Sequence, residues 1–199
     1  MGKYYRRNYY QGAYYHIYNK GNAGQNIFNK DEDYIFYLKK VREFKERHKI
    51  TVICYCLLPD HFHSIIRQDS EIPVSKFILS LHTSYVLYFN QKYERTGHLF
   101  QGRFQVSNIE EDKFLLPLSS YIHLNPIVHR VTNDLYKYPW SSYLDYIGKR
   151  AGTLCEKSVI LKDKTSDWYR KFTEEKIKER MKYPEFWEKI SKFLPRTMA

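Results

Sequence analysis

Apolar and polar residues follow two rhythms along this chain, and these rhythms divide it into strands and helices. Continuous or alternating apolar residues with many β-branched and aromatic side chains predict strands, whereas apolar residues at every third or fourth position predict helices. The predicted order is strand, helix, strand, strand, helix, strand, helix, over residues 13–19, 31–47, 50–58, 61–67, 74–93, 103–109 and 112–125. This order predicts an α+β fold in which a largely antiparallel sheet of four to five strands is flanked by helices.

Prolines set the end of the last predicted helix and interrupt its middle. Asn125 is expected to be its last residue, because Pro126 disfavours helical geometry in the residue before it. Pro117 lies inside the same helix, four residues before Tyr121, where a proline removes a backbone hydrogen bond and bends the helix. We therefore expect the placement of Tyr121 to depend on where this helix begins.

The chain after this helix has a different pattern. Residues 127–150 predict a connector with a short helical turn from Trp140 to Ile147. Residues 166–194 combine many charges with spaced aromatic and apolar side chains, which predicts packing helices. We expect three parts: a basic aromatic arm over residues 1–12, a main domain over residues 13–150, and a helical basic extension over residues 151–199.

Positive charge is concentrated at the two ends of the chain. Hydrophobic residues make up 43% of the sequence, which excludes a disordered chain, and the formal net charge is +11. The net charge is +4 over residues 1–20, +1 over residues 21–148 and +6 over residues 149–199. Such ends favour a nucleic acid or an anionic membrane surface as partner, and the alternative is a solvated surface that promotes solubility. Lys3, Arg6 and Arg7 alternate with tyrosines, and this mixture favours single-stranded nucleic acid.

Targeting signals and cysteines bear on the compartment. No apolar stretch reaches the roughly 20 residues that cross a bilayer, and the first twelve residues lack the apolar core of a signal peptide. Cys54, Cys56 and Cys155 give neither a disulfide framework nor a zinc-binding spacing, so we expect reduced thiols. These observations favour a cytoplasmic protein without a membrane partner.

His61 and His63 form a candidate metal site on the predicted strand 61–67. Because side chains alternate along a strand, both imidazoles point to one face and Phe62 points to the other. Two imidazoles are half of a metal site, which needs at least one further ligand. The alternative is that they are two ordinary histidines on a half-buried strand.

Tyr121 and Asn125 form a second candidate pair on the predicted helix 112–125. Residues four apart share one face of a helix, so the phenol and the amide point the same way. An amide oxygen can bind a divalent ion, and a phenol beside that ion is a candidate nucleophile. The alternative is that Tyr121 is one of 20 tyrosines packed in a core and that Asn125 only ends the helix.

Four ordered motifs carry a resemblance to a known family. They are YYHIYNKGNAGQNIF, LLPDHFHSII, TGHLFQGRF and YIHLNPIVHR, within residues 14 to about 147. With them the chain resembles the single-tyrosine HUH transposases of insertion sequences, and among these the REP-associated tyrosine transposases. The resemblance implies the HUH endonuclease fold, which is similar to ferredoxin-like and RRM-like sheets.

The resemblance also implies a role for each matching residue. His61 and His63 correspond to the paired histidines that bind a divalent metal, Tyr121 corresponds to the nucleophile, and Asn125 corresponds to the polar ligand one helical turn later. The implied metal is Mg²⁺ or Mn²⁺, although histidines alone also suit zinc. We also expect the basic residues of the arm and the motifs to contact DNA: Lys3, Arg6, Arg7, Lys20 and Arg103.

The implied activity is a metal-dependent endonuclease and strand transferase that acts on single-stranded, hairpin-forming DNA through a covalent 5′-phosphotyrosine. Two other functions stay open from the residues. One is a non-catalytic protein that binds single-stranded nucleic acid. The other is a metal-dependent phosphodiesterase that activates water and does not need Tyr121. The sequence also leaves open whether the protein acts as a monomer or a homodimer.

Overall fold

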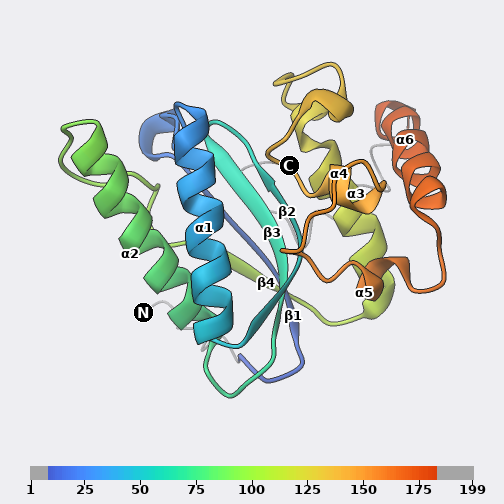
Figure 1. The fold of residues 1–199 in the computed structure, drawn as a ribbon, viewed down its shortest axis with the longest axis horizontal. Coiled ribbons are helices and arrows are strands. Elements are labelled where there is room, and N and C mark those ends of the chain that lie inside the picture. The colour runs from blue at the N-terminus through green and yellow to red at the C-terminus, as the bar shows by residue number, and fades with distance from the viewer. Residues whose placement is uncertain (1–8, 183–199) are drawn as a thin grey trace, which may run out of the picture.

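A four-stranded antiparallel sheet separates two groups of helices (Figure 1). The computed structural model describes residues 9–182. The strand order is β2-β3-β1-β4, with β1 at Tyr14–Lys20, β2 at Ile50–Leu57, β3 at His61–Gln68 and β4 at Gln105–Ile109. The helices α1 (Asp31–Arg47) and α2 (Val74–Lys92) cover one face, and α3 (Leu115–Val128) and α6 (Ser166–Lys182) lie on the other side. The short elements are η1 (Asn22–Gly24), η2 (Asp112–Phe114), η3 (Leu135–Lys137), α4 (Tyr143–Tyr146) and α5 (Ser158–Leu161).

The alternation of side chains along β1 and β3 sorts them between the two faces. Ile17 and Phe62 belong to the core beneath α1 and α2. His16 and His63 point to the opposite face, toward α3, because neighbouring residues in a strand point in opposite directions. The register pairs Tyr18 with His63, so these two side chains share that face.

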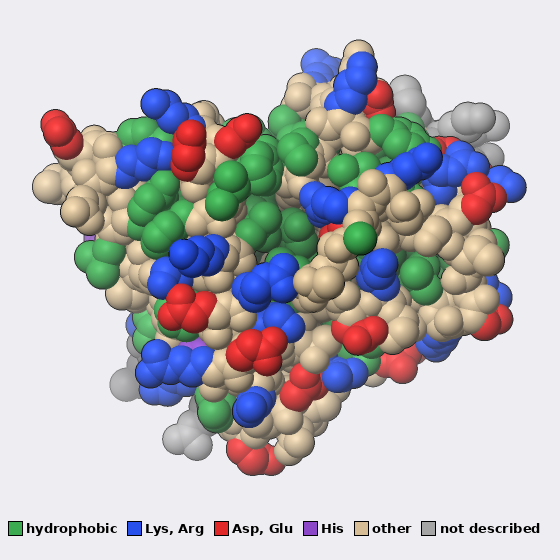
Figure 2. Space-filling view, viewed as in Figure 1, with side chains coloured by type: hydrophobic (Ala, Val, Ile, Leu, Met, Phe, Trp, Pro, Cys, Tyr) green, Lys and Arg blue, Asp and Glu red, His purple; other side chains and the backbone are tan. Residues whose placement is uncertain are grey.

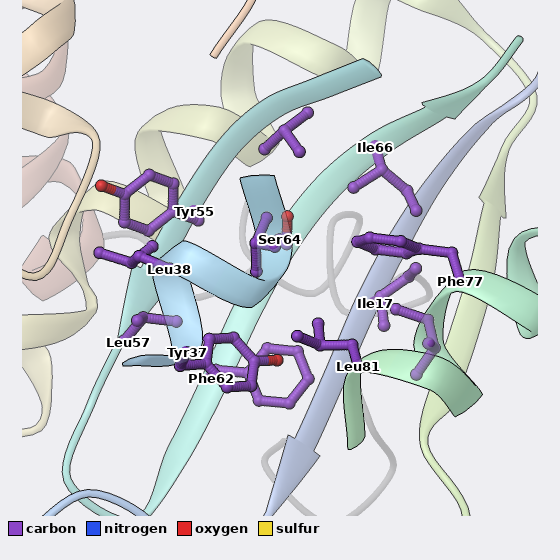
Figure 3. Close-up of a pocket in the computed structure, with 13 residues that line it drawn as sticks. Ile17, Tyr37, Leu38, Tyr55, Leu57, Phe62, Ser64, Ile66, Phe77 and Leu81 are labelled. Atoms are coloured by element: carbon purple, nitrogen blue, oxygen red, sulfur yellow. The ribbon is translucent and has the colours of Figure 1, made fainter. Parts of the chain in front are cut away.

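The face beneath α1 and α2 is a closed aromatic core. Figure 3 shows Tyr37 of α1, Leu81 of α2 and Phe62 of β3 converging on one cavity. Its volume is about 20 Å³, which is room for a single water molecule. This side of the sheet therefore contributes stability and has no space for a substrate at that point.

The predicted order of strands and helices is confirmed. The predicted end of the last of these helices is wrong. The helix α3 continues through Pro126 to Val128 instead of ending at Asn125. Pro126 has no N–H to donate to the carbonyl of Ile122, but the side-chain Nδ2 of Asn125 donates to that carbonyl at 3.2 Å. The side chain of Asn125 thus replaces the bond that the proline removes, and the helix is preserved.

Pro117 does not bend the helix that carries Tyr121. The predicted start near Asp112 is a separate 3-10 turn, η2, and α3 itself begins at Leu115. Pro117 is therefore the third residue of α3, in the first turn, where backbone N–H groups have no helical partner. Tyr121 lies one turn later, in regular helix.

The segment after α3 packs against the edge of the sheet. The hydroxyl of Tyr138 donates to the carbonyl of Leu57 at 2.6 Å, and Cys155 forms a parallel bridge with Val52, so the β2 edge is covered.

The predicted helices over residues 166–194 are confirmed up to Lys182, and the rest lies outside the described residues. In the described part of the chain, no helix is long and apolar enough to cross a membrane. The division into three parts stays a prediction.

Candidate functional site

Two buried histidines of β3 form the centre of the site. His61 is 2% exposed and His63 is 0% exposed. Their ring centroids are 5.3 Å apart, and their ring planes are nearly perpendicular, at 87°. Both side chains point toward α3, as the alternation along the strand predicts.

A hydrogen bond at Nδ1 holds each imidazole. His61 Nδ1 lies 2.7 Å from Asp60 Oδ1, and His63 Nδ1 lies 3.0 Å from Nε2 of His16 on β1. The bond from His61 lowers the pKa of the Asp60 carboxyl, which is therefore a carboxylate at neutral pH. With Nδ1 engaged in both rings, Nε2 is the atom suited to bind a metal, and a carboxylate behind the imidazole is the usual support for such a ligand.

Tight loop contacts fix the turn that leads into His61. The backbone N–H of Gly21 donates to the carbonyl of Asp60 at 2.7 Å, and the N–H groups of Ile27 and Phe28 both donate to the carbonyl of Pro59. A Cβ on Gly21 would lie 1.8 Å from the carbonyl oxygen of Gln25, so this position requires glycine. The loop after β1 therefore holds the hairpin that presents the histidines.

Asn125 presents its side-chain oxygen inside the protein. Its Nδ2 donates to the carbonyls of Tyr121 and Ile122, each at 3.2 Å, which fixes the orientation of the amide. Asn125 is 0% exposed, and its Oδ1 has no hydrogen-bond partner among the described residues. A buried polar atom without a partner costs free energy, so such an atom requires an explanation.

Tyr121 lies on the same side of α3 as Asn125 and beside the histidine pair. Four residues along a helix return the side chain to within about 40° of the same direction. The ring of Tyr121 is edge-on to that of His63, with centroids 6.3 Å apart. Tyr121 is 2% exposed. Tyr121 of α3 and His63 of β3, one from each predicted pair, are therefore neighbours across the interface between the sheet and α3.

The residues of this interface fit a divalent metal. His61 Nε2 is buried and has no hydrogen-bond partner in the described residues, as is true of Asn125 Oδ1. Over residues 9–182, no three His, Cys, Asp and Glu side chains are grouped to hold a metal, so a third ligand must be of another type. The amide oxygen of Asn125 meets that requirement, because carbonyl and imidazole ligands together suit Mg²⁺, Mn²⁺ or zinc.

Three residues around the histidines were not predicted from the sequence. His16 and Asp60 contact the Nδ1 atoms, and the ring of His129 lies 4.6 Å from that of His61, by centroids. Asp60 directly precedes His61 in the sequence, so its contact with that histidine could have been predicted. His16 is 47 residues from His63, and only the strand pairing brings them together.

The five residues predicted to contact DNA lie in separate parts of the chain. Lys20 is half-buried at the end of β1, opposite His61 in the strand register. The N–H of Gln101 donates to the carbonyl of Lys20 at 2.8 Å, which brings the loop of the exposed Arg103 to this end of the sheet. The other three, Lys3, Arg6 and Arg7, lie outside the described residues.

Comparisons with known proteins decide the family. The family model "Transposase IS200 like" matches residues 9–125, which span the sheet, the histidine pair, Tyr121 and Asn125. The chain belongs to the IS200-like transposase family. Members of this family are tyrosine nucleases and typically use a divalent metal.

Two known proteins are similar to the chain. A Haemophilus influenzae protein named REP-associated tyrosine transposase is 26% identical over 157 residues, which cover 70% of this chain and 84% of that protein. The structure of a REP-associated tyrosine transposase bound to a REP hairpin superposes with a TM-score of 0.63 at 18% identity, and covers 80% of this chain and 96% of that one. The second likeness confirms the α+β fold with its four-stranded sheet and carboxy-terminal helices.

Charge on the visible face of the molecule is mixed. Figure 2 shows Lys and Arg side chains scattered among acidic ones over this face, with hydrophobic side chains in the depression between α1 and the carboxy-terminal helices. This face therefore does not form one continuous basic stripe along which a nucleic-acid backbone would bind.

Proposed function

We propose that this chain is a metal-dependent endonuclease and strand transferase that cleaves single-stranded DNA beside a hairpin and forms a covalent 5′-phosphotyrosine at Tyr121. The observation that carries the proposal is the meeting of two chemically different pairs. His61 and His63 lie on one strand face, and Tyr121 and Asn125 lie on the adjoining side of α3. Membership in a family of tyrosine nucleases supports the same assignment.

His61, His63 and Asn125 would hold the divalent ion. When bound, Mg²⁺ or Mn²⁺ supplies positive charge that offsets the negative charge that builds on a phosphodiester during substitution at phosphorus. The protein fixes the ligands in advance, because Asp60 and His16 hold the two imidazoles and the α3 backbone holds the amide.

Tyr121 supplies the nucleophile. Its phenolic oxygen attacks phosphorus, a bond forms between that oxygen and phosphorus, and the bond to the 3′ oxygen of the preceding nucleotide breaks. The phenol loses its proton, the departing strand takes one up as a 3′ hydroxyl, and the following strand remains on Tyr121 through its 5′ phosphate. Because the ester retains the bond energy, a second 3′ hydroxyl can reverse the step and join strands. Since Tyr121 is buried, the substrate must displace the groups that cover its hydroxyl.

The substrate is a hairpin with an unpaired strand beside it. A relative in this family has been seen with a REP hairpin, and this supports a hairpin for the present chain. A nucleophile fixed on a helix reaches an unpaired phosphate more easily than one in an intact duplex. Lys20 and Arg103, at the same end of the sheet as His61, would contact the backbone of that strand.

The test is covalent capture of labelled DNA. With Mn²⁺ and hairpin DNA taken from beside its own gene, the protein should form a denaturation-resistant adduct that carries a 3′ label and not a 5′ label. Tyr121→Phe should bind the DNA and form no adduct. Tyr37→Phe is the matched control, because it also removes a buried hydroxyl, one without a hydrogen-bond partner in the described residues, from the opposite face of the sheet.

Other outcomes would replace the proposal. Cleavage by Tyr121→Phe without an adduct would favour a phosphodiesterase that activates water. Tight hairpin binding by the wild type, without cleavage under Mg²⁺, Mn²⁺ or zinc, would favour a non-catalytic binding protein.

A further inference from the structure

The helix that carries Tyr121 is buried on all sides. Residues 118–126 of α3 are buried without exception, between the sheet on one side and α6 on another. An amphipathic helix is held in one rotation by its apolar stripe, and α3 has no such stripe. Another feature must therefore fix which of its sides faces the histidines.

A chain of buried hydrogen bonds on the far side of α3 supplies that feature. Nδ1 of His123 lies 2.8 Å from the hydroxyl of Tyr169 on α6, and Nε2 lies 2.7 Å from Oγ of Ser142. The hydroxyl of Tyr169 also lies 3.0 Å from Oγ of Ser119, one helical turn before His123. All four of these residues are 0% exposed. His123 is two residues from both Tyr121 and Asn125, and so it points to the opposite side of the helix.

Further contacts tie this group of residues to β2. Oγ of Ser119 also donates to the carbonyl of Leu116, and Oγ of Ser142 accepts the backbone N–H of Tyr55 on β2 and lies 3.2 Å from the carbonyl of the same residue. The two tautomers of His123 give opposite donor directions along this chain of bonds, and in either one the chain joins α6, α3 and β2.

Burial raises the pKa of Tyr169 well above its usual value, so its hydroxyl stays protonated and can take part in these bonds. A rotation of α3 by one residue would leave several of these atoms buried without partners, which is costly.

We infer that Tyr169 and His123 are positioning residues, and that α6 is a part of the catalytic scaffold that sets the rotation of α3 and so the placement of Tyr121 and Asn125. This inference rests on the proposed function. The match to the family model ends at residue 125, so Ser142 and Tyr169 lie outside it.

The test uses Tyr169→Phe in the full chain, with the adduct assay and Mn²⁺ titration by electron paramagnetic resonance. The variant keeps the ring and removes the two hydrogen bonds. We expect DNA affinity within about twofold of the wild type, an adduct rate at saturating DNA that is at least about tenfold lower, and weaker Mn²⁺ binding, because small misplacement of a nucleophile has large kinetic effects. The double variant of Tyr169→Phe with His123→Phe should be no slower than His123→Phe alone, because both act through one bond.

Gln68→Met is the matched control for lost stability. Gln68 is 1% exposed at the far end of β3, and its amide also makes two hydrogen bonds, with Val74 and Ser70. At a temperature where circular dichroism finds both variants folded, Gln68→Met should form adduct at the wild-type rate. If Tyr169→Phe does not fold, Ser119→Ala removes a single bond to the same hydroxyl and should slow the adduct several-fold.

Two results would overturn the inference. One is a Tyr169→Phe variant that folds and has the wild-type adduct rate and Mn²⁺ affinity. If Tyr169→Phe does not fold, the same result for Ser119→Ala would overturn the inference. The other is an equal slowing by Gln68→Met, which would make the loss a general effect of stability. Neither result bears on the wild-type adduct, whose absence would instead refute the proposed function.

Discussion

The sheet face beneath α1 and α2 is filled with rings and aliphatic side chains, and the face beneath α3 holds histidines, an amide and a phenol. The first face surrounds a cavity of only about 20 Å³. Buried polar atoms without a partner within the described residues occur on both faces: the hydroxyl of Tyr37 lies among apolar side chains on the first, and His61 Nε2 and Asn125 Oδ1 lie on the second, which also holds Tyr121. Both faces use the same strands, so the difference comes from the alternation of residue types along them and from the different helices that cover each face.

The two faces therefore have different roles: the face beneath α1 and α2 mainly stabilises the fold, and the face beneath α3 carries the candidate site. Apolar burial favours folding roughly in proportion to the area removed from water, and the α1 and α2 face supplies much of it. Buried polar atoms without partners oppose folding, and natural proteins accept that cost at functional sites. Substitutions on the two faces should therefore give different phenotypes.

The largest expected effect is on the α3 face, from the loss of a metal ligand. His61→Ala or His63→Ala should reduce Mn²⁺-dependent cleavage to background and abolish Mn²⁺ binding, while circular dichroism at 25 °C still reports a folded chain. His82→Phe is the comparison on the other face, because His82 is half-buried and stacks on Phe100 at 4.2 Å between ring centroids. Cleavage by His61→Ala at the wild-type rate would contradict the assignment of the site to the α3 face.

The next effect is on stability, from a buried carboxylate in the first turn of α1. Asp33 is 0% exposed and accepts hydrogen bonds from Lys92 at 2.7 Å, Tyr93 at 2.7 Å and two backbone N–H groups. Burial alone would raise the pKa of Asp33, but these bonds outweigh it and the pKa is lowered. Asp33→Asn should lower the free energy of unfolding by about 3–5 kcal/mol at pH 7, as for other broken buried pairs.

The sign of the pH dependence follows from the lowered pKa. The stabilisation by Asp33 is present above the pKa of an unfolded aspartate, about 4, and is lost as the pH falls through the lower folded value. Urea unfolding should therefore find a large difference between wild type and Asp33→Asn at pH 7 that shrinks at low pH. The exposed Asp31, in the same turn, is the control, and an equal effect of Asp31→Asn would show that the buried bonds do not matter.

A smaller effect is expected behind the metal ligands. Asp60→Ala should weaken Mn²⁺ binding by roughly 10-fold to 100-fold, because the carboxylate orients His61. Asp60→Asn keeps an oxygen that can accept from Nδ1 and should lose less. A Mn²⁺ titration should therefore rank the affinities as wild type, then Asp60→Asn, then Asp60→Ala. Equal losses of affinity in the two variants would show that Asp60 does not act by orienting His61.

The smallest effect concerns DNA binding by the amino-terminal arm. Deletion of residues 1–8 removes Lys3, Arg6 and Arg7 and leaves Tyr9, whose ring packs against Tyr15 at 5.6 Å between centroids. The slope of log affinity for single-stranded DNA against log salt should become shallower by up to roughly 0.7 for each lost phosphate contact. An unchanged slope would exclude the arm from DNA binding.

The sequence predicted this fold well because most of its signals are local. The histidine spacing on a strand, the acidic start of α1 and the apolar run of β2 each depend on neighbouring residues. The end of α3 was mispredicted because Pro126 was considered without the side chain of Asn125, which replaces the missing backbone bond. The contacts of His16 with His63 and of Tyr169 with His123 depend on strand pairing and helix packing across 47 and 46 residues, which periodicity does not report.

The central claim is that Tyr121, and no other tyrosine of the 20 in this chain, carries the DNA. Mass spectrometry of the trypsin-digested adduct, after nuclease trimming, tests this most directly. Trypsin cleavage after Lys113 and Arg130 releases residues 114–130, in which Tyr121 is the only tyrosine. The account predicts that this peptide gains the mass of a 5′-nucleotide. A nucleotide on any other peptide, or DNA cleaved with no modified peptide, would contradict it.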